Sequence, residues 1–484
     1  MKNGTNGKLP LRVKLSYGAG DLYGGGATTL ISMYYLYFLT DVLQISPALA
    51  GTAFLISKIW DAVTDPFMGI ISDNTRTRFG RRRPYFLAGI FLIFISFALM
   101  WAPLPFRSEG IKFLYVLISY LFFSTVYTVV WVPYNSIAAE LTKDYNERTK
   151  LSTYRMIFSN ISGILAGTLA KDIFVDTLSP GDPGRGFFMM SIVFGLFFAL
   201  PYIATFLYCK EDPEAMNAPR KRIESMKSFL TEYFVEPFRL KPFRSVMQMF
   251  LFGFMAQDAV LALAVYFLTY YLNMSSMMTL LVPVYLFMLL AIPLTEALSL
   301  RIGKRKTYII SCILWIFSFV LIPFMRSPEA AKSLIYVFGA FFGTAAAGIS
   351  VMVFAMFPDV PDADELFSGV RREGIYSGIF AFLRKSGSAL VMFLIGSGIQ
   401  MAGYIPPTGT VQHAQTQGFL NFLLILFISL PVIFVLIALR ACVKYPLTRE
   451  VHQRLKAALA LRHAEGETAD ALEENELKQI LGDA

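Results

Sequence analysis

Long apolar segments separated by short charged loops constrain the fold of this chain more than any other feature. A helix that crosses a lipid bilayer needs about 20 mostly apolar residues. Hydrophobic residues make up 55% of the 484 positions and charged residues only 16%, against about 25% charged residues in soluble proteins. The sequence predicts twelve spanning helices, at 13–42, 47–73, 84–104, 112–140, 150–176, 187–209, 245–273, 277–300, 307–325, 331–357, 373–403 and 417–441.

Alternate loops between these segments differ sharply in charge. The cations gather in one set of loops, which contains Arg76, Arg78, Arg81, Arg82 and Arg83, then Arg220, Lys221 and Arg222, then Arg301, Lys304, Arg305 and Lys306, and then Arg371 and Arg372. Loops rich in Lys and Arg stay in the cytoplasm, so we expect an integral multi-pass protein of the plasma membrane, in bacteria the inner membrane, with both termini cytoplasmic. The net charge of +9 therefore indicates membrane topology and no nucleic-acid partner.

The two halves of the chain resemble each other. Tyr37-Phe-Leu-Thr40 in the first span recurs as Tyr266-Phe-Leu-Thr269 in the seventh, and Phe79-Gly-Arg-Arg-Arg-Pro-Tyr85 after the second is echoed by Ile302-Gly-Lys-Arg-Lys-Thr-Tyr308 after the eighth. We expect an all-α membrane protein of two pseudo-symmetric six-helix bundles. The predicted parts are 1–209, a cytoplasmic central loop at 210–244, the second bundle at 245–442 and a cytoplasmic tail at 443–484.

Three charged residues interrupt the second apolar segment. Lys58, Asp61 and Asp65 are spaced three and four residues apart, which places them on one face of a helix. A charge at bilayer depth costs about 3 kcal/mol or more, so it normally faces a partner or a water-filled cavity. The trio carries one net negative charge, which a bound cation or proton would neutralise. A structural ion pair with Lys58 is the competing interpretation.

Catalytic and metal chemistry have little support in the sequence. Three scattered cysteines and three histidines do not form a metal-ligand pattern, and no nucleophile–base pair emerges. We expect no enzyme activity and no cofactor.

Several motifs together resemble the glycoside–pentoside–hexuronide:cation symporters of the major facilitator superfamily. The motifs are Tyr17-Gly-Ala-Gly-Asp21, the segment 34–41, Trp60-Asp61-Ala-Val-Thr-Asp65-Pro66, Thr75-Arg-Thr-Arg-Phe-Gly-Arg-Arg-Arg-Pro84, Val370-Arg-Arg-Glu-Gly374 and Tyr445-Pro-Leu-Thr-Arg-Glu450. The resemblance covers nearly the whole chain and implies the major facilitator fold.

The resemblance also implies functional residues. Asp61 and Asp65 match the family's cation ligands, and Thr64 and Thr128 offer further oxygens for Na⁺ or H⁺, with Li⁺ as a third candidate. Tyr127 and Arg155 match residues near the sugar. Lys385 matches an eleventh-span lysine near the site and is a further candidate for substrate contact, and because its ammonium lies in an apolar run we expect it near Asp61 or Asp65. By alignment, the positions of the acidic residues that hold galactosides are Gly25 and Trp131, and that of a sugar-stacking tryptophan is Asn135. A galactoside substrate is therefore not expected.

Other residues are candidates from their own chemistry. Tyr34, Tyr127 and Trp131 are potential sugar-stacking aromatics or ordinary packing, and Asn135 lies beside them. Asp258 and Gln257 are adjacent polar residues in the seventh span, available for substrate contact or for an interhelical hydrogen bond. Candidate coupling or gating residues are Lys58, Asp73, Arg81, Arg82, Asp359, Arg371 and Arg372.

The sequence favours a secondary active symporter that couples Na⁺ or H⁺ to uptake of a sugar or glycoside by alternating access. Transport of a lysolipid or another amphipathic organic acid is the first alternative, and a membrane sensor without transport is the second. The expected partners are a small-molecule substrate and the lipid bilayer, and the expected functional state is a monomer.

Overall fold

The computed structural model describes residues 9–103, 106–142, 145–211, 237–274, 276–325, 328–368, 373–407, 413–465 and 471–482. Across these residues the chain is helical, and its only β-pairing is two isolated bridges. Arg371 and Arg372, and most of the central loop, lie outside the described residues.

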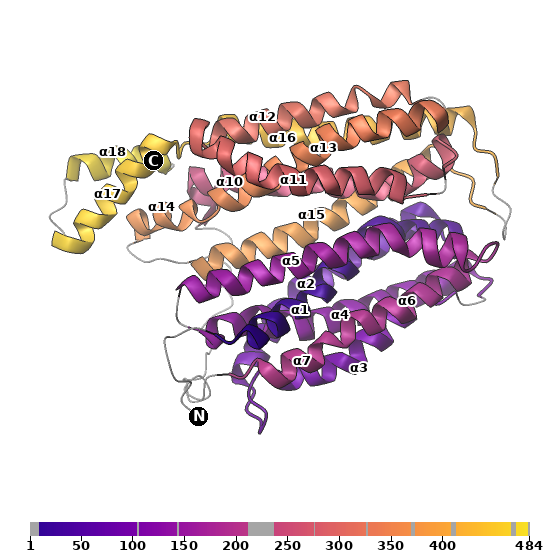
Figure 1. Cartoon of the computed structure of the whole chain (residues 1–484), viewed down its shortest axis with the longest axis horizontal. Coiled ribbons are helices and arrows are strands. Elements are labelled where there is room, and N and C mark those ends of the chain that lie inside the picture. Colours follow the sequence, from indigo (N-terminus) through magenta and orange to yellow (C-terminus); the bar gives the residue numbers. More distant parts are fainter. Residues whose placement is uncertain are drawn as a thin grey trace.

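The first half forms one group of helices. Its elements are α1 (Leu11–Leu30) with the π-helical turns η1 (Ile31–Tyr35) and η2 (Phe38–Val42), α2 (Pro47–Asn74), α3 (Arg83–Met100), α4 (Glu109–Leu141), α5 (Tyr145–Leu169) with η3 (Ala170–Thr177), α6 (Pro183–Ala199) and α7 (Pro201–Tyr208). Figure 1 shows these helices side by side in the lower part of the view.

The second half forms the other group. Its elements are η4 (Pro237–Arg239), α10 (Lys241–Tyr266) with η5 (Phe267–Tyr271), α11 (Met278–Ile302), α12 (Lys304–Phe319) with η6 (Ile322–Phe324), α13 (Pro328–Met356), α14 (Asp359–Ser368), α15 (Glu373–Met401) and α16 (Gln417–Val443). The tail forms α17 (Arg449–Glu465) and α18 (Ala471–Leu481). Both marked termini lie toward the same end of the molecule (Figure 1), which we call the terminal end; the opposite one is the far end.

Nine helices of the described chain are long and apolar enough to cross a membrane. Three of the predicted spans, α1, α2 and α5, are not among these nine helices. Each of the three carries charged residues within its length. Charged residues inside a spanning helix are normally found on a face that is shielded from lipid. The three less apolar helices therefore identify where a polar site lies.

The repeated sequence adopts the same local structure in both halves. Tyr37-Phe-Leu-Thr40 runs into η2 and Tyr266-Phe-Leu-Thr269 into η5, so both segments change from α-helix to π-helix. The two segments also meet, because the Thr40 hydroxyl lies 2.7 Å from the Tyr266 hydroxyl. The repeat predicted from sequence thus corresponds to two matching turns that contact each other at the far end.

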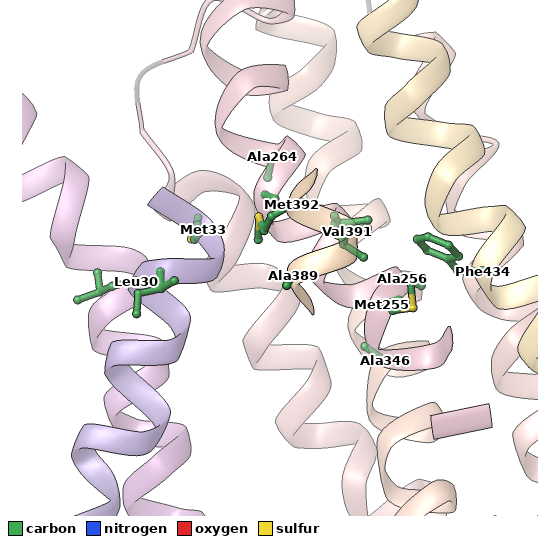
Figure 2. Packing of buried hydrophobic residues seen from close by; sticks show 14 of the residues in the cluster. Leu30, Met33, Met255, Ala256, Ala264, Ala346, Ala389, Val391, Met392 and Phe434 are labelled. Carbon is green, nitrogen blue, oxygen red and sulfur yellow. The ribbon is translucent and has the colours of Figure 1, made fainter. Parts of the chain in front are cut away.

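Small side chains allow close packing around α10, the most buried of the candidate spans. Figure 2 shows Ala256 and Ala264 of α10 near Ala346 of α13 and Ala389 of α15. Without a large side chain between them, neighbouring helices approach closely, which is the usual basis of helix association in membranes.

The tail packs on the second half. Leu455, Leu477 and Leu481 are buried, and His452 of α17 lies 3.3 Å from Asp362 of α14. The predicted cytoplasmic tail is thus anchored to α14 in the structure. The apolar faces of two short helices need a partner, and α14 supplies it.

Two glycines bring α2 and α15 together at the far end. A Cβ on Gly51 would lie 2.8 Å from the Cα of Phe393, and one on Gly396 would overlap the carbonyl oxygen of Pro47. Both obstacles are backbone atoms, which cannot rotate away.

Gly396→Ala should therefore lower the thermal stability of the detergent-solubilised protein, because overpacking typically costs about 1–3 kcal/mol. Gly398→Ala is the matched control, since its nearest neighbour is a Leu426 side-chain carbon at 3.6 Å. The melting temperatures of both variants would be compared with the parent. Equal melting temperatures for the two variants would contradict the close approach of α2 and α15.

Candidate functional site

The two predicted acids of α2 lie at the middle of the helix, facing α4 and α15. The side chain of Asp61 is 4% exposed and that of Asp65 is 29% exposed. An ionised group that faced lipid at this depth would be strongly unfavourable. The exposed part of Asp65 therefore indicates that water reaches this face of α2.

Asp61 is held within the first half. Its Oδ2 accepts a hydrogen bond of 2.8 Å from Lys58 Nζ, and its Oδ1 accepts one from the Ser124 hydroxyl of α4. The Ser57 hydroxyl lies 3.0 Å from the Ser124 hydroxyl. Asp61 thus sits among a lysine and two serine oxygens.

Asp65 joins the two halves. Its Oδ1 accepts a hydrogen bond of 2.6 Å from Thr128 of α4, and its Oδ2 accepts one of 2.6 Å from Lys385 Nζ of α15. Lys385 Nζ also lies 3.8 Å from Asp61 Oδ2. The sequence predicted one uncompensated negative charge, which is wrong for this conformation, because Lys385 makes the cluster of two acids and two lysines neutral.

The oxygen atoms of this cluster are suitable ligands for a hard monovalent cation. Two carboxylates and the hydroxyls of Ser57, Ser124 and Thr128 provide oxygen ligands, which hard cations prefer. The described part of the chain contains no group of three or more His, Cys, Asp or Glu side chains that could hold a metal ion.

Three predicted site residues are oriented differently from expectation. The Thr64 hydroxyl donates to the Trp60 carbonyl of its own helix and to neither carboxylate. Tyr34 is fully buried and donates to the Gly167 carbonyl, inside the first half. The Asn135 amide donates to the Trp131 carbonyl one turn earlier. Sequence spacing locates such residues on a helix but does not determine their hydrogen-bond partners.

A row of stacked groups leads from Lys385 to Arg155. Lys385 Nζ lies 5.5 Å from the centre of the Tyr127 ring, which stacks on Trp131 at 5.3 Å. The Arg155 guanidinium lies 4.9 Å from the Trp131 ring. Cation–π contacts of this kind are favourable, so four predicted residues form one continuous surface beside the carboxylates.

Asp258 pairs with a residue that the sequence analysis did not select. Its carboxylate binds both terminal nitrogens of Arg384, at 2.5 and 2.8 Å, while Gln257 donates to Ser350. Asp258 and Gln257 therefore each bond to another helix, which is one of the two roles that the sequence left open. Arg384 could have been found, because it is a second cation in the apolar run that contains Lys385. Ser124 could have been found too, since it lies one turn before Thr128 on α4.

The predicted gate residues pair within their own halves in this conformation. Arg82 binds Asp73 at 2.9 Å, and both Arg81 and Arg82 bind Glu140 at 2.5 Å. In the second half Asp359 binds Lys304 at 2.6 Å. The proposed pairing across the halves at the terminal end stays a prediction for another conformation.

The far end is closed by hydrogen bonds between the halves. Asp41 of η2 accepts from the Tyr270 hydroxyl of η5, which lies 3.0 Å from the Tyr404 hydroxyl. Asp172 of η3 accepts from Ser276 at 2.7 Å and from the Met277 amide at 3.0 Å, at the start of α11. Asp41 and Asp172 were not among the predicted site residues, since nothing in their local sequence indicates partners in the other half.

Tyr270→Phe should loosen this closure, because it removes a hydroxyl donor from the buried Asp41, and an unsatisfied buried group costs about 1–3 kcal/mol. Backbone hydrogen exchange in the 38–45 segment should accelerate roughly tenfold or more by the same estimate. Tyr271→Phe is the control, as it removes a neighbouring hydroxyl that is not bonded to Asp41. Unchanged exchange in Tyr270→Phe would show that the contact does not close the far end.

The chain is similar to known transporters over almost all of its length. The family described as MFS/sugar transport protein matches residues 16–449. The isoprimeverose transporter of Lactiplantibacillus pentosus is 26% identical, over 94% of this chain and 93% of its own. A glucuronide carrier protein homolog of Escherichia coli is 25% identical, over 92% of this chain and 94% of its own.

Solved structures agree with the fold. The nucleoside transporter NupG superposes with a TM-score of 0.57 at 16% identity, over 90% of this chain and 99% of that one. The chain therefore belongs to the MFS/sugar transport protein family, as a transporter of the glycoside–pentoside–hexuronide:cation symporter type within the major facilitator superfamily.

Proposed function

We propose that this protein couples the movement of Na⁺ or H⁺ to the uptake of a sugar or glycoside. The observation that carries the proposal is the neutral cluster at mid-span, in which Lys385 of the second half provides the positive charge for Asp65 of the first. A site that must contain one positive charge is also able to accept a cation in place of the lysine.

The coupling step is competition between the cation and Lys385. A cation held by Asp61, Asp65 and the hydroxyls of α4 would neutralise the acids and release the ammonium of Lys385. Release breaks the mid-span bond between the halves and frees them to rock about the site. Because binding free energies are linked, a substrate that binds better in the cation-loaded state must tighten cation binding by the same factor.

The proposed orientation of the protein in the membrane rests on the charge of its loops. The basic loops lie at the terminal end, and the positive-inside rule favours a cytoplasmic location for that end. Since the far end is closed by contacts between the halves, this conformation is then the one that releases its cargo inside the cell.

The substrate class is supported by the relatives and by the aromatic surface beside the carboxylates. The isoprimeverose transporter favours a sugar, and Tyr127 and Trp131 offer aromatic faces to it. An organic acid is the second candidate, favoured by the glucuronide carrier homolog and by Arg155, whose side chain is 29% exposed.

Asp61→Asn should abolish cation-stimulated uptake, because the amide cannot neutralise a cation. We expect a loss of roughly ten- to a hundredfold, the size of a hydrogen bond to a charged group. Uptake into proteoliposomes would be measured with a Na⁺ gradient at constant pH and, separately, with a pH gradient without Na⁺, which also identifies the ion. Asp182→Asn is the control, since Asp182 is an exposed N-cap that Asn can replace. Parent-like stimulation in Asp61→Asn would remove the assignment.

Lys385→Gln tests the competition directly. Without the ammonium, the cluster regains its net negative charge and should bind the coupling cation at several-fold lower concentration, measured by cation-dependent thermal stabilisation. Uptake should nevertheless fall, because the exchange that links cation binding to movement of the halves is lost. Weaker cation binding in Lys385→Gln would mean that the lysine supports the ion site and does not compete with it.

A further inference from the structure

Each half supplies a side chain that caps the second spanning helix of the other half. Asp172 of η3, which continues α5, accepts hydrogen bonds from the backbone amides of Met277 and Met278 at 3.0 and 3.2 Å, where α11 begins. Gln400, near the end of α15, accepts one of 2.8 Å through its side-chain oxygen from the amide of Ala48, where α2 begins. We call these contacts the Asp172 cap and the Gln400 cap.

The capped amides are equivalent in the internal repeat. The offset in sequence from Ala48 to Met277 equals the offset from Tyr37 to Tyr266, the start of the repeated segment. The side chains that cap them come from the fifth spanning helix of each half, where Gln400 lies one residue before the position that the same offset assigns to Asp172. The pseudo-symmetry of the bundles therefore relates the two caps, and each half caps the other.

Both caps must break when the far end opens. The first amides of a helix have no acceptor within the helix, so a side chain or water has to bind them. A capping side chain stabilises the start of a helix because it accepts from these amides. Here the capping side chain and the capped helix belong to different halves, so separation of the halves at the far end exchanges each cap for water.

The two caps differ in charge and in the number of donors. The Asp172 carboxylate also accepts from the Ser276 hydroxyl at 2.7 Å, which makes three donors, whereas the neutral Gln400 oxygen accepts from one. A negative charge at a helix N-terminus is stabilised by the helix dipole, and hydrogen bonds to a charged acceptor are stronger than neutral ones. The nearby Asp176 binds Lys171 of its own half at 2.8 Å. Of the two caps, the Asp172 cap is therefore the stronger.

We propose that Asp172 and Gln400 are gating residues that hold the far end closed, and that the charge of Asp172 biases the carrier toward this conformation. The inference does not depend on which ion or substrate is carried. Both residues act on backbone amides at the far end, away from the carboxylates of Asp61 and Asp65 at mid-span. They set how often the far end opens and leave the composition of the cation cluster unchanged.

The bias affects how the carrier responds to a ligand on either side of the membrane. A ligand that arrives at the far end can bind only those carriers that are open there, so its apparent affinity falls with the open fraction. A ligand at the terminal end meets the larger fraction of carriers. The strength of the Asp172 cap thus determines how unequal the two sides are, although the binding residues are the same for both.

Distances between spin labels at both ends test the proposal. Arg107→Cys with Ala414→Cys forms the far-end pair, and Lys210→Cys with Lys444→Cys forms the terminal-end pair. All four positions are exposed, and the three native cysteines are buried, so the label attaches to the introduced cysteines. Double electron–electron resonance is measured on the full-length protein in lipid nanodiscs without added substrate.

Asp172→Ala should raise the ratio of open to closed carriers at the far end about tenfold, because a cap and a charge beside the helix dipole are both lost. The terminal end should close in the same proportion, since the halves rock against each other as bodies. Asp172→Asn keeps a capping oxygen and should shift the ratio less. Gln400→Glu adds a charge to the other cap, so combined with Asp172→Ala it should reverse part of the shift. Asp176→Asn is the matched control, since it removes an acid of the same segment that is paired within its own half.

The terminal-end pair separates a gating role from a structural one. Wider far-end distances in Asp172→Ala without closer terminal-end distances would show that the substitution only frays α11, and would overturn the proposal. Parental distances in Asp172→Ala, an equal shift in Asp176→Asn, or a parent that is mostly open at the far end would overturn it as well. If Asp172→Ala does not fold, Asp172→Asn decides in the same way, because asparagine is itself a favourable capping residue.

Discussion

The contact between Lys385 of α15 and Asp65 of α2 is the interaction on which the rest of the structure depends. It joins the halves at mid-span. It also supplies the second positive charge of the cluster, and without that charge two carboxylates would share the site with a single lysine. Breaking an ion pair by removal of one partner is costly in a poorly solvated site, because the other charge is left uncompensated. The partial exposure of Asp65 lowers that cost and keeps the bond exchangeable. In the proposed mechanism, a cation that arrives from water replaces the lysine without leaving either acid unpaired.

The two ends of the molecule are built differently around this contact. At the far end, Gly51 and Gly396 let α2 and α15 touch backbone to backbone, and the matching turns η2 and η5 bring Thr40 to Tyr266. At the terminal end, the ion pairs of Arg82 and Lys304 remain within their own halves. The halves thus meet closely at the far end, where side chains are small and polar bonds cross between them, whereas at the terminal end each half keeps these charges paired within itself.

Sequence reasoning succeeded where the outcome depends on periodicity and on the unfavourable free energy of charge in lipid. It predicted the segments that became helices, the stripe of Lys58, Asp61 and Asp65, and a partner for Lys385 near those acids. It failed where the outcome depends on which helix lies opposite. It did not identify Gly167 as the partner of Tyr34 or Arg384 as the partner of Asp258. The closure by Asp41 and Tyr270 joins two residues that are far apart in the chain, and no local pattern specifies such a pairing.

The charged pairs within the spans divide into two kinds with different consequences for movement. Asp21–Arg155 and Asp258–Arg384 each connect helices of one half, so they survive any rigid rotation of one bundle against the other. Asp65–Lys385 crosses between the halves, so a large rotation must break it. An ion that takes the place of Lys385 turns this cross-half bond into a site made entirely of first-half oxygens. The charges of the two acids are then balanced inside one bundle, and separation of the bundles leaves only Lys385 without a counter-charge. In the proposed mechanism, coupling arises from that difference, because without the cation the separation would expose an unpaired acid as well as an unpaired lysine.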